Sequence, residues 1–179
     1  MIGVLVSGEG SNLQALIDGR LPIAAVASNR PNVRALERAA AAGIPARVFS
    51  LEAHASRDRR DTEMATWLAL RGVDFVVSAG YMHLLTRRFL EWFPERIVNV
   101  HPSLLPAFPG PRAIDDALAA GVTTTGVTVH YVDEGLDTGT VIRQEPVPVE
   151  PQETLVERIH AVEHRLLPEV VRALCSAVH

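Results

Sequence analysis

The chain is organised around residues 97–106, which read IVNVHPSLLP. The first of these residues are apolar and favour a strand, and Pro102 has no N–H to donate to a sheet, so the strand is predicted to end there. Side chains alternate between the two faces of a strand, so Asn99 and His101 lie on the same face. Ligands of open α/β sheets bind at the carboxyl ends of strands. The pair therefore marks a candidate ligand site, while a histidine that only closes its turn remains the alternative.

The rest of the chain alternates strand-like and helix-like segments, which is typical of a parallel sheet covered by helices. The predicted strands are Ile2–Val6, Ile23–Ala27, Arg47–Phe49, Asp74–Ala79 and Ile97–His101, followed by an antiparallel pair, Gly126–Val132 and Val141–Val147. The predicted helices include Val33–Ala42, Arg57–Leu70, Thr86–Trp92, Ala113–Ala120 and Thr154–Leu174. We expect one domain over residues 1–179, of the α/β class. It should be Rossmann-like, with a mostly parallel central sheet, helices on both faces and the antiparallel strand pair near the C-terminal half.

Composition excludes several classes of protein. All 17 basic residues among the 179 are arginines, so a pyridoxal Schiff base, a P-loop lysine and a Ser-x-x-Lys nucleophile are excluded. The net charge of -4 gives no reason to expect nucleic acid as a partner. Cys175 is the single cysteine, which argues against a disulfide framework and favours a reducing, cytoplasmic compartment. No signal peptide and no apolar run of the ~20 residues that span a bilayer are evident, so no membrane association is expected.

The loop after the first strand, SGEGSN over residues 7–12, is a candidate phosphate site. Its glycines let backbone N–H groups and the start of a helix face an anion, and Ser11 and Asn12 are expected to cap that helix. A dinucleotide fingerprint would need a third glycine where Leu13 stands and an acidic residue after the second strand. A single phosphate is therefore favoured over a dinucleotide, and a simple capped turn is the alternative.

Two further patterns have competing interpretations. Asp137, between Gly135 and Gly139, is either a turn residue or, if it reaches His101, a carboxylate that orients and charges the imidazole. His160 to His164 match the H-x-x-E-H zinc pattern, which we reject because a hydrolytic zinc site needs a third protein ligand. No metal site is therefore expected.

Two segments near the middle of the chain have ordinary structural explanations. The charged run SRDRRD over residues 56–61 fits a solvated helix start with an acidic residue near its positive end. Residues 80–85, GYMHLL, follow a predicted strand, and they can pack in the core or against a flat hydrophobic ligand.

Together these motifs resemble the phosphoribosylglycinamide formyltransferase family, folate-dependent enzymes of purine synthesis. The strongest element is NVHPSLLP over residues 99–106 with FPG at 108–110, supported by SGEGSNL at 7–13, VHYV at 129–132 and LDTG at 136–139. The likeness implies the formyltransferase fold. It also implies transfer of the formyl group of 10-formyltetrahydrofolate to the glycine amine of glycinamide ribonucleotide, without a metal. We expect a monomer or homodimer.

The resemblance also implies roles for individual residues. Asn99, His101 and Asp137 match the catalytic trio, with His101 as general acid and Asn99 as oxyanion donor. Gly10, Ser11 and Asn12 match the phosphate-binding positions, and Glu163 matches a ribose contact. The folate positions are Arg57, Met82, His83, Leu84 and Leu85, together with Asn99.

The chain departs from the family at two places. His83 stands where the family usually has arginine, and Arg112, after Pro111, stands where it commonly has histidine. Three alternatives remain from other classes. Formyltetrahydrofolate deformylase shares the Asn-x-His-Pro string but normally has an extra N-terminal domain, and methionyl-tRNA formyltransferase normally adds a basic RNA-binding domain; neither addition is expected here. A non-catalytic nucleotide-binding domain would keep the loop at residues 7–12 without needing the polar trio.

Overall fold

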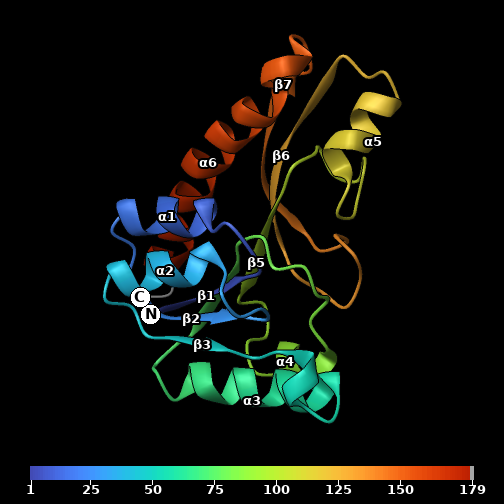
Figure 1. The fold of residues 1–179 in the computed structure, drawn as a ribbon. Coiled ribbons are helices and arrows are strands. Elements are labelled where there is room, and N and C mark those ends of the chain that lie inside the picture. Colours follow the sequence, from blue (N-terminus) through green and yellow to red (C-terminus); the bar gives the residue numbers. More distant parts are fainter. Residues whose placement is uncertain (178–179) are drawn as a thin grey trace. The chain divides into compact units, whose positions relative to one another are not determined.

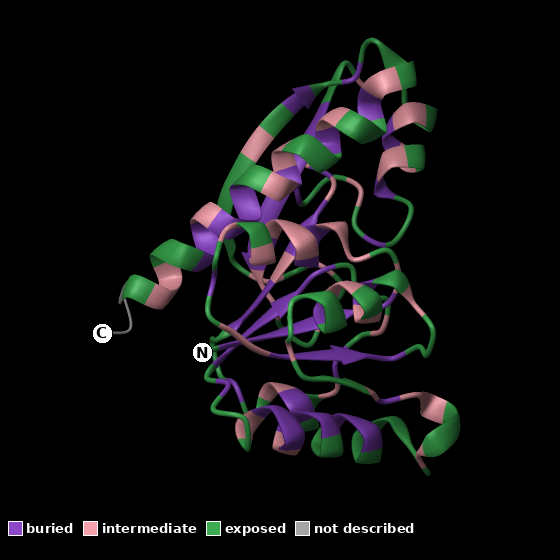
Figure 2. Cartoon of the chain, turned by 60° about the vertical axis from the view of Figure 1, so that its left-hand side comes forward, coloured by how far each residue is buried: buried purple, intermediate pink, exposed green. Residues whose placement is uncertain are grey.

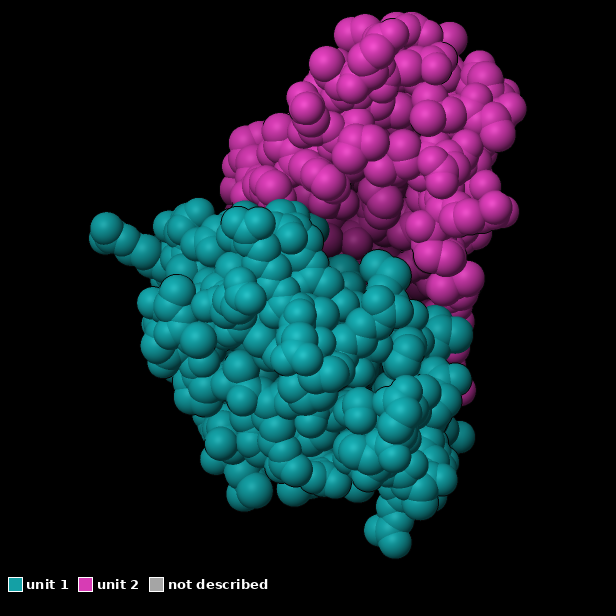
Figure 3. All heavy atoms as spheres, in the orientation of Figure 1, with its two compact units in different colours: residues 1–98 teal, residues 99–179 magenta. Residues whose placement is uncertain are grey.

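The computed structural model describes residues 1–177 of the chain. The chain divides into two compact units, residues 1–98 and residues 99–179 (Figure 3). Each unit has its own arrangement of strands and helices. Organisation as a single functional domain stays a prediction.

Unit 1 is a parallel sheet between two layers of helices. In chain order its elements are β1 (Ile2–Val6), α1 (Ser11–Asp18), β2 (Ile23–Ser28), α2 (Arg34–Ala41), β3 (Ala46–Val48), the short 3-10 turn Leu51–Ala53, α3 (Arg57–Ala69), β4 (Phe75–Ser78) and α4 (Arg87–Leu90). The strands lie in the order β3-β2-β1-β4, and every pairing is parallel. Helices α1 and α2 cover one face of the sheet and α3 the other (Figure 1).

The sequence explains why the strands of unit 1 are central. All five residues of β1 and all four of β4 are buried, as expected for strands covered on both faces, and Figure 2 shows them as buried ribbons between the helices. The Val76 N–H donates to the Arg96 carbonyl at 2.8 Å, so β4 pairs with the segment that leads into β5 (Ile97–His101).

Unit 2 begins within β5 and is built on an antiparallel pair. Its further elements are α5 (Ala113–Ala119), β6 (Thr124–Tyr131), β7 (Val141–Pro148), the 3-10 turn Gln152–Thr154 and α6 (Leu155–Ala177). Strands β6 and β7 pair from Thr124 opposite Pro148, and the register shifts between Val129 and His130. Helix α6 contacts both strands, and it continues through Pro168 without ending. Its buried residues include Leu155, Ile159, Leu166 and Val170.

These findings confirm the predicted fold class. The parallel strands, the helices on both faces of the unit 1 sheet and the antiparallel pair β6–β7 are all present, and most element boundaries differ from prediction by one to three residues. Among residues 1–177, no helix combines the length and the apolar character needed to cross a bilayer.

The predicted helix cap at Ser11 and Asn12 is wrong. Helix α1 begins at Ser11 itself, and the N-cap position is Gly10, whose backbone is left-handed with φ 72°. A Cβ on Gly10 would lie 2.6 Å from the Cβ of Ala35 in α2 and 2.8 Å from its Cα. Glycine at this position therefore lets the chain enter α1 directly while α2 packs against the turn.

We expect Gly10→Ala to lower the free energy of unfolding by about 2–4 kcal/mol, because the left-handed backbone and the overlap with Ala35 each contribute roughly 1–2 kcal/mol. Urea denaturation followed by circular dichroism measures the change. Gly8→Ala is the matched control in the same loop, because a Cβ at Gly8 would meet no atom within 4 Å. Similar losses in both variants would contradict this account of Gly10.

Candidate active site

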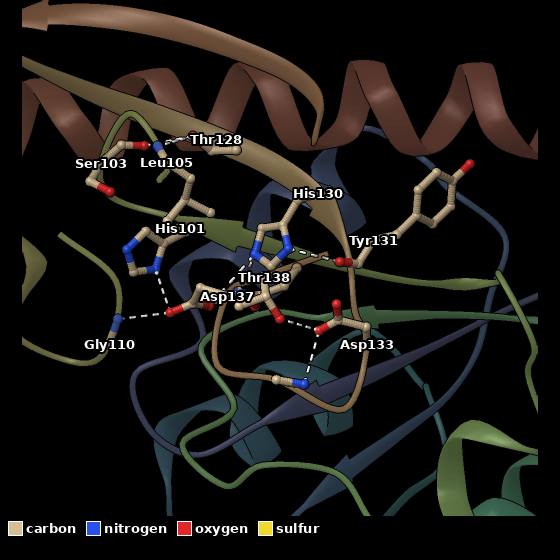
Figure 4. A network of polar contacts seen from close by, with 12 residues as sticks. His101, Ser103, Leu105, Gly110, Thr128, His130, Tyr131, Asp133, Asp137 and Thr138 are labelled. Carbon is tan, nitrogen blue, oxygen red and sulfur yellow. Dashed lines mark hydrogen bonds and ion pairs between the residues drawn. The ribbon is translucent and has the colours of Figure 1, made fainter. Parts of the chain in front are cut away.

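The predicted trio of side chains gathers at the carboxyl end of β5. His101 Nδ1 lies 3.4 Å from Asp137 Oδ2, and Asn99 Nδ2 lies 3.5 Å from Asp137 Oδ1. Asn99 and His101 thus reach the same carboxylate, as the alternation along the strand predicted. Figure 4 shows His101 and Asp137 facing each other, with Asp137 coming from the loop between β6 and β7.

The loop that carries Asp137 is braced at several points. Asp133 Oδ1 accepts hydrogen bonds from the Gly135 N–H at 3.0 Å and the Thr138 hydroxyl at 2.7 Å. A Cβ on Gly139 would lie only 1.7 Å from the Tyr131 carbonyl oxygen, so the loop closes against β6 only with glycine there. Asp137 itself has a left-handed φ of 54°. It is therefore both a turn residue and the partner of His101.

His130 is a fourth member of this cluster, which sequence reasoning did not identify as a site residue. At the end of β6, its Nδ1 lies 2.8 Å from the Tyr131 carbonyl and its Nε2 lies 3.6 Å from Asp137 Oδ1 (Figure 4). The same Nε2 lies 3.2 Å from Asn99 Nδ2. The sequence does indicate His130 by its position, because, like His101, it is a histidine at the end of an apolar strand.

Asp137 is ionised at neutral pH. Burial raises its pKa, but hydrogen bonds from the His130 side chain and the Gly110 N–H, at 2.8 Å, together with the charges that His101 and His130 can carry, lower the pKa below its usual value. A negative charge is therefore fixed beside His101, although the Asp137 side chain is only 11% exposed.

The second nitrogen of His101 also faces an acceptor. His101 Nε2 lies 2.8 Å from the carbonyl oxygen of Phe108, a residue with a left-handed φ of 53°. The buried Ser103 hydroxyl donates to the Ala107 carbonyl and, at 3.3 Å, to that of Phe108, so it holds this segment in place. With a carboxylate on one side and a carbonyl on the other, the ring can use an N–H on each nitrogen.

The predicted phosphate loop lies in unit 1. Gly10 precedes α1, Ser11 begins the helix and Asn12 is buried in its first turn. The predicted ribose contact, Glu163, is buried in α6 of unit 2. The binding roles of these residues stay predictions.

The predicted folate segment is also in unit 1, after β4. Met82 and Leu84 are 59% and 47% exposed, whereas Leu85 is buried. Arg57, the first residue of α3, donates a hydrogen bond to the Leu84 carbonyl, so the structure brings Arg57 together with residues 82–85.

The charged run at residues 56–61 is only partly a solvated helix start. Ser56 does cap α3 by accepting from the Arg59 N–H at 3.2 Å, and Arg57 is exposed. Arg60 and Asp61, however, are fully buried, so the solvated interpretation is wrong for these two residues. They pair with each other, and Arg60 contacts His83 in the predicted folate segment.

The H-x-x-E-H residues lie on α6. The rings of His160 and His164 stack with their centroids 6.0 Å apart. Within the described residues, no group of three or more His, Cys, Asp or Glu side chains is arranged to hold a metal ion.

Comparison with known proteins identifies the family. Residues 1–171 match the model described as formyl transferase. Phosphoribosylglycinamide formyltransferase of Mycobacterium tuberculosis is 47% identical over 181 residues, covering 97% of this chain and 84% of the relative. The trifunctional purine biosynthetic protein adenosine-3 of Drosophila pseudoobscura is 46% identical, but the chain spans only 14% of its length. The crystal structure of glycinamide ribonucleotide transformylase 1 from Symbiobacterium toebii superposes with a TM-score of 0.94 at 46% identity, over 98% of this chain and 87% of that one. The chain therefore belongs to the formyl transferase family.

Proposed function

We propose that this chain transfers the formyl group of 10-formyltetrahydrofolate to the glycine amine of glycinamide ribonucleotide, giving formylglycinamide ribonucleotide and tetrahydrofolate in de novo purine biosynthesis. The observation that carries the proposal is the gathering of Asn99, His101 and Asp137 at the end of β5. The names of the relatives, phosphoribosylglycinamide formyltransferase and glycinamide ribonucleotide transformylase, support the choice of substrate.

In the proposed reaction the amine attacks the formyl carbon directly, and negative charge develops on the formyl oxygen. The Asn99 amide donates a hydrogen bond to this oxyanion. Removing one such donor typically costs roughly 3–4 kcal/mol of transition-state stabilisation. His101 acts as general acid and gives a proton to the folate nitrogen as it leaves.

Asp137 orients the His101 ring, and its negative charge balances the positive charge of the acid form. The environment of the ring supports this role, since Asp137 Oδ2 and the Phe108 carbonyl give an imidazolium an acceptor near each N–H. A water beside Asp137 can relay the proton that the attacking amine loses.

The substrate contacts are proposed from the family pattern. Gly10, Ser11 and Asn12 hold the phosphate of the ribonucleotide, and Glu163 contacts its ribose. The formyl donor is bound by Arg57, residues 82–85 and Asn99. The Met82 and Leu84 side chains, exposed beside the Arg57 contact, suit a flat apolar ring. A metal-free reaction, a monomeric or homodimeric state and a cytoplasmic location stay predictions.

One assay separates the transferase from the deformylase and from a binding module. The protein is incubated with 10-formyltetrahydrofolate, with and without glycinamide ribonucleotide, and release of tetrahydrofolate is followed by absorbance. Release that requires the ribonucleotide is the expected result. Release that ignores it would identify a hydrolase, and no release in either case would favour the non-catalytic nucleotide-binding domain.

We expect Asp137→Asn to lower kcat by roughly 10²–10⁴-fold, because a neutral amide cannot balance the charged ring of the general acid. Affinity for the ribonucleotide, measured by calorimetry, should change little. Asp133→Asn is the matched control: it lies in the same loop, and its amide oxygen can still accept from Gly135 and Thr138. Equal losses of turnover and affinity in Asp137→Asn would mean that Asp137 serves only the turn.

The lowered pKa of Asp137 predicts how its contribution to stability depends on pH. A carboxyl group whose pKa is lower in the folded state stabilises the fold fully above its unfolded pKa, about 3.9, and this stabilisation is lost as the pH falls through the folded pKa. The difference in free energy of unfolding between wild type and Asp137→Asn should therefore move toward its acid limit as the pH falls below about 4. Urea denaturation of both proteins at several pH values tests this, and a difference that is independent of pH down to pH 2 would contradict it.

A further inference from the structure

Unit 1 contains a fully buried arginine that the proposed reaction does not use. Arg60 in α3 has the largest side chain among those that are completely buried. Its Nε lies 2.7 Å and its Nη2 2.6 Å from Oδ1 of Asp61, which is also fully buried. Asp61 Oδ2 accepts the Thr86 N–H at 2.7 Å. A buried charge is tolerated only when it is paired, so Asp61 fixes the guanidinium in place.

The remaining nitrogen of Arg60 faces His83. Arg60 Nη1 lies 2.6 Å from His83 Nδ1. A guanidinium has only N–H donors and does not lose its proton in proteins, so Nδ1 must be the acceptor and cannot carry a proton. His83 is therefore a neutral imidazole, and its one proton is on Nε2.

A second donor reaches the same ring. Asn29 Nδ2 lies 3.4 Å from Nδ1 and 3.3 Å from Nε2 of His83. Because Nε2 carries the proton, the amide can donate only to Nδ1. The amide is oriented with its nitrogen toward the ring because its oxygen accepts the Ser7 hydroxyl at 2.6 Å. Ser7 in turn accepts the Met82 N–H at 2.8 Å, which ties this arrangement to the segment that carries His83.

The charges around His83 act in the same direction. Burial and the positive charges of Arg60, Arg57 and Arg30 lower the pKa of His83, and they outweigh the Asp61 carboxylate. Tyr81, whose ring centroid is 6.0 Å from that of His83, adds no negative charge, because burial raises its pKa to about 12.

We propose that Arg60 is a positioning residue that holds His83 as a neutral imidazole protonated on Nε2, so that residues 82–85 present a hydrogen-bond donor, and not a positive charge, to an acceptor atom of the formyl donor. The hydrogen bond to the formyl donor rests on the proposed function, whereas the protonation state of the His83 ring does not. The permanent positive charge is carried by the buried Arg60. Residue 83 itself carries none, although the family usually has arginine there.

The protonation state can be measured directly in the wild-type protein. We expect ¹⁵N NMR of histidine-labelled protein, with His83 assigned through His83→Gln, to show a protonated Nε2 and an unprotonated Nδ1 from pH 8 down to pH 6. A proton on Nδ1, or an imidazolium at pH 7, would overturn the proposal. This measurement needs no turnover, so it distinguishes failure of this inference from failure of the proposed formyl transfer.

Arg60→Met tests the positioning role, with the exposed Arg59→Met in the same helix as control. In Arg60→Met, His83 should titrate nearer its ordinary pKa of about 6.5, and the KM for 10-formyltetrahydrofolate should rise by about 2–10-fold at pH 8 while kcat changes less than twofold. The ratio of variant to wild-type KM should also vary between pH 8 and pH 6. Arg59→Met should change neither quantity.

Two outcomes of the variant experiment would contradict the proposal. One is a His83 signal in Arg60→Met that is unchanged from wild type, and the other is an equal effect on kcat and KM at every pH. Because Arg60→Met leaves Asp61 buried without its partner, Arg60→Met with Asp61→Asn is the second variant if the single one does not fold; an asparagine oxygen can still accept the Thr86 N–H. The wild-type spectrum decides the state of the ring in either case.

Discussion

The hydrogen bonds that converge on the Asp137 carboxylate organise the candidate active site. They come from separate parts of unit 2: the Gly110 N–H, in the loop after β5, and the Asn99 amide, on β5 itself, donate hydrogen bonds to it. The imidazole rings of His101 and His130 lie within ion-pair distance of the same carboxylate, at 3.4 and 3.6 Å. A largely buried carboxylate needs hydrogen-bond donors around it, and each donor group is held in position by its contact with the carboxylate. The loop at Gly135 to Gly139 brings the carboxylate to β5, and its close approach to Tyr131 is possible only because residue 139 has no side chain.

The sequence predicts those parts of this arrangement that follow from local periodicity. Asn99 and His101 share a face because side chains alternate along a strand, and Pro102 is followed by a loop for lack of an N–H. The contact of Asp137 with His101 could not be derived from local pattern, because it depends on a left-handed residue and on a register shift before His130. His130 was missed for a related reason: within an apolar strand, one histidine resembles a core residue.

Two errors of sequence interpretation show how packing overrides local preference. Ser11 and Asn12 are good capping residues, but the contact of Gly10 with Ala35 sets where α1 begins. The charged run before α3 resembles a solvated helix start, but Arg60 and Asp61 precede Met64 and Ala65 by four residues, so they lie on the buried face of the helix. The helical spacing of Arg60 and Asp61 relative to the apolar residues indicates a buried position, whereas their charges suggest an exposed one.

His101 and His83 illustrate how one residue type acquires opposite chemistry from its neighbours. A carboxylate and a backbone carbonyl face the nitrogens of His101, so each nitrogen has an acceptor for an N–H, as the proposed general acid needs. The Arg60 guanidinium faces Nδ1 of His83, so a second proton on that nitrogen would meet a donor. In the proposed arrangement the buried Arg60, fixed by Asp61, does more than fill the core of unit 1: it determines which hydrogen-bonding group His83 offers a ligand.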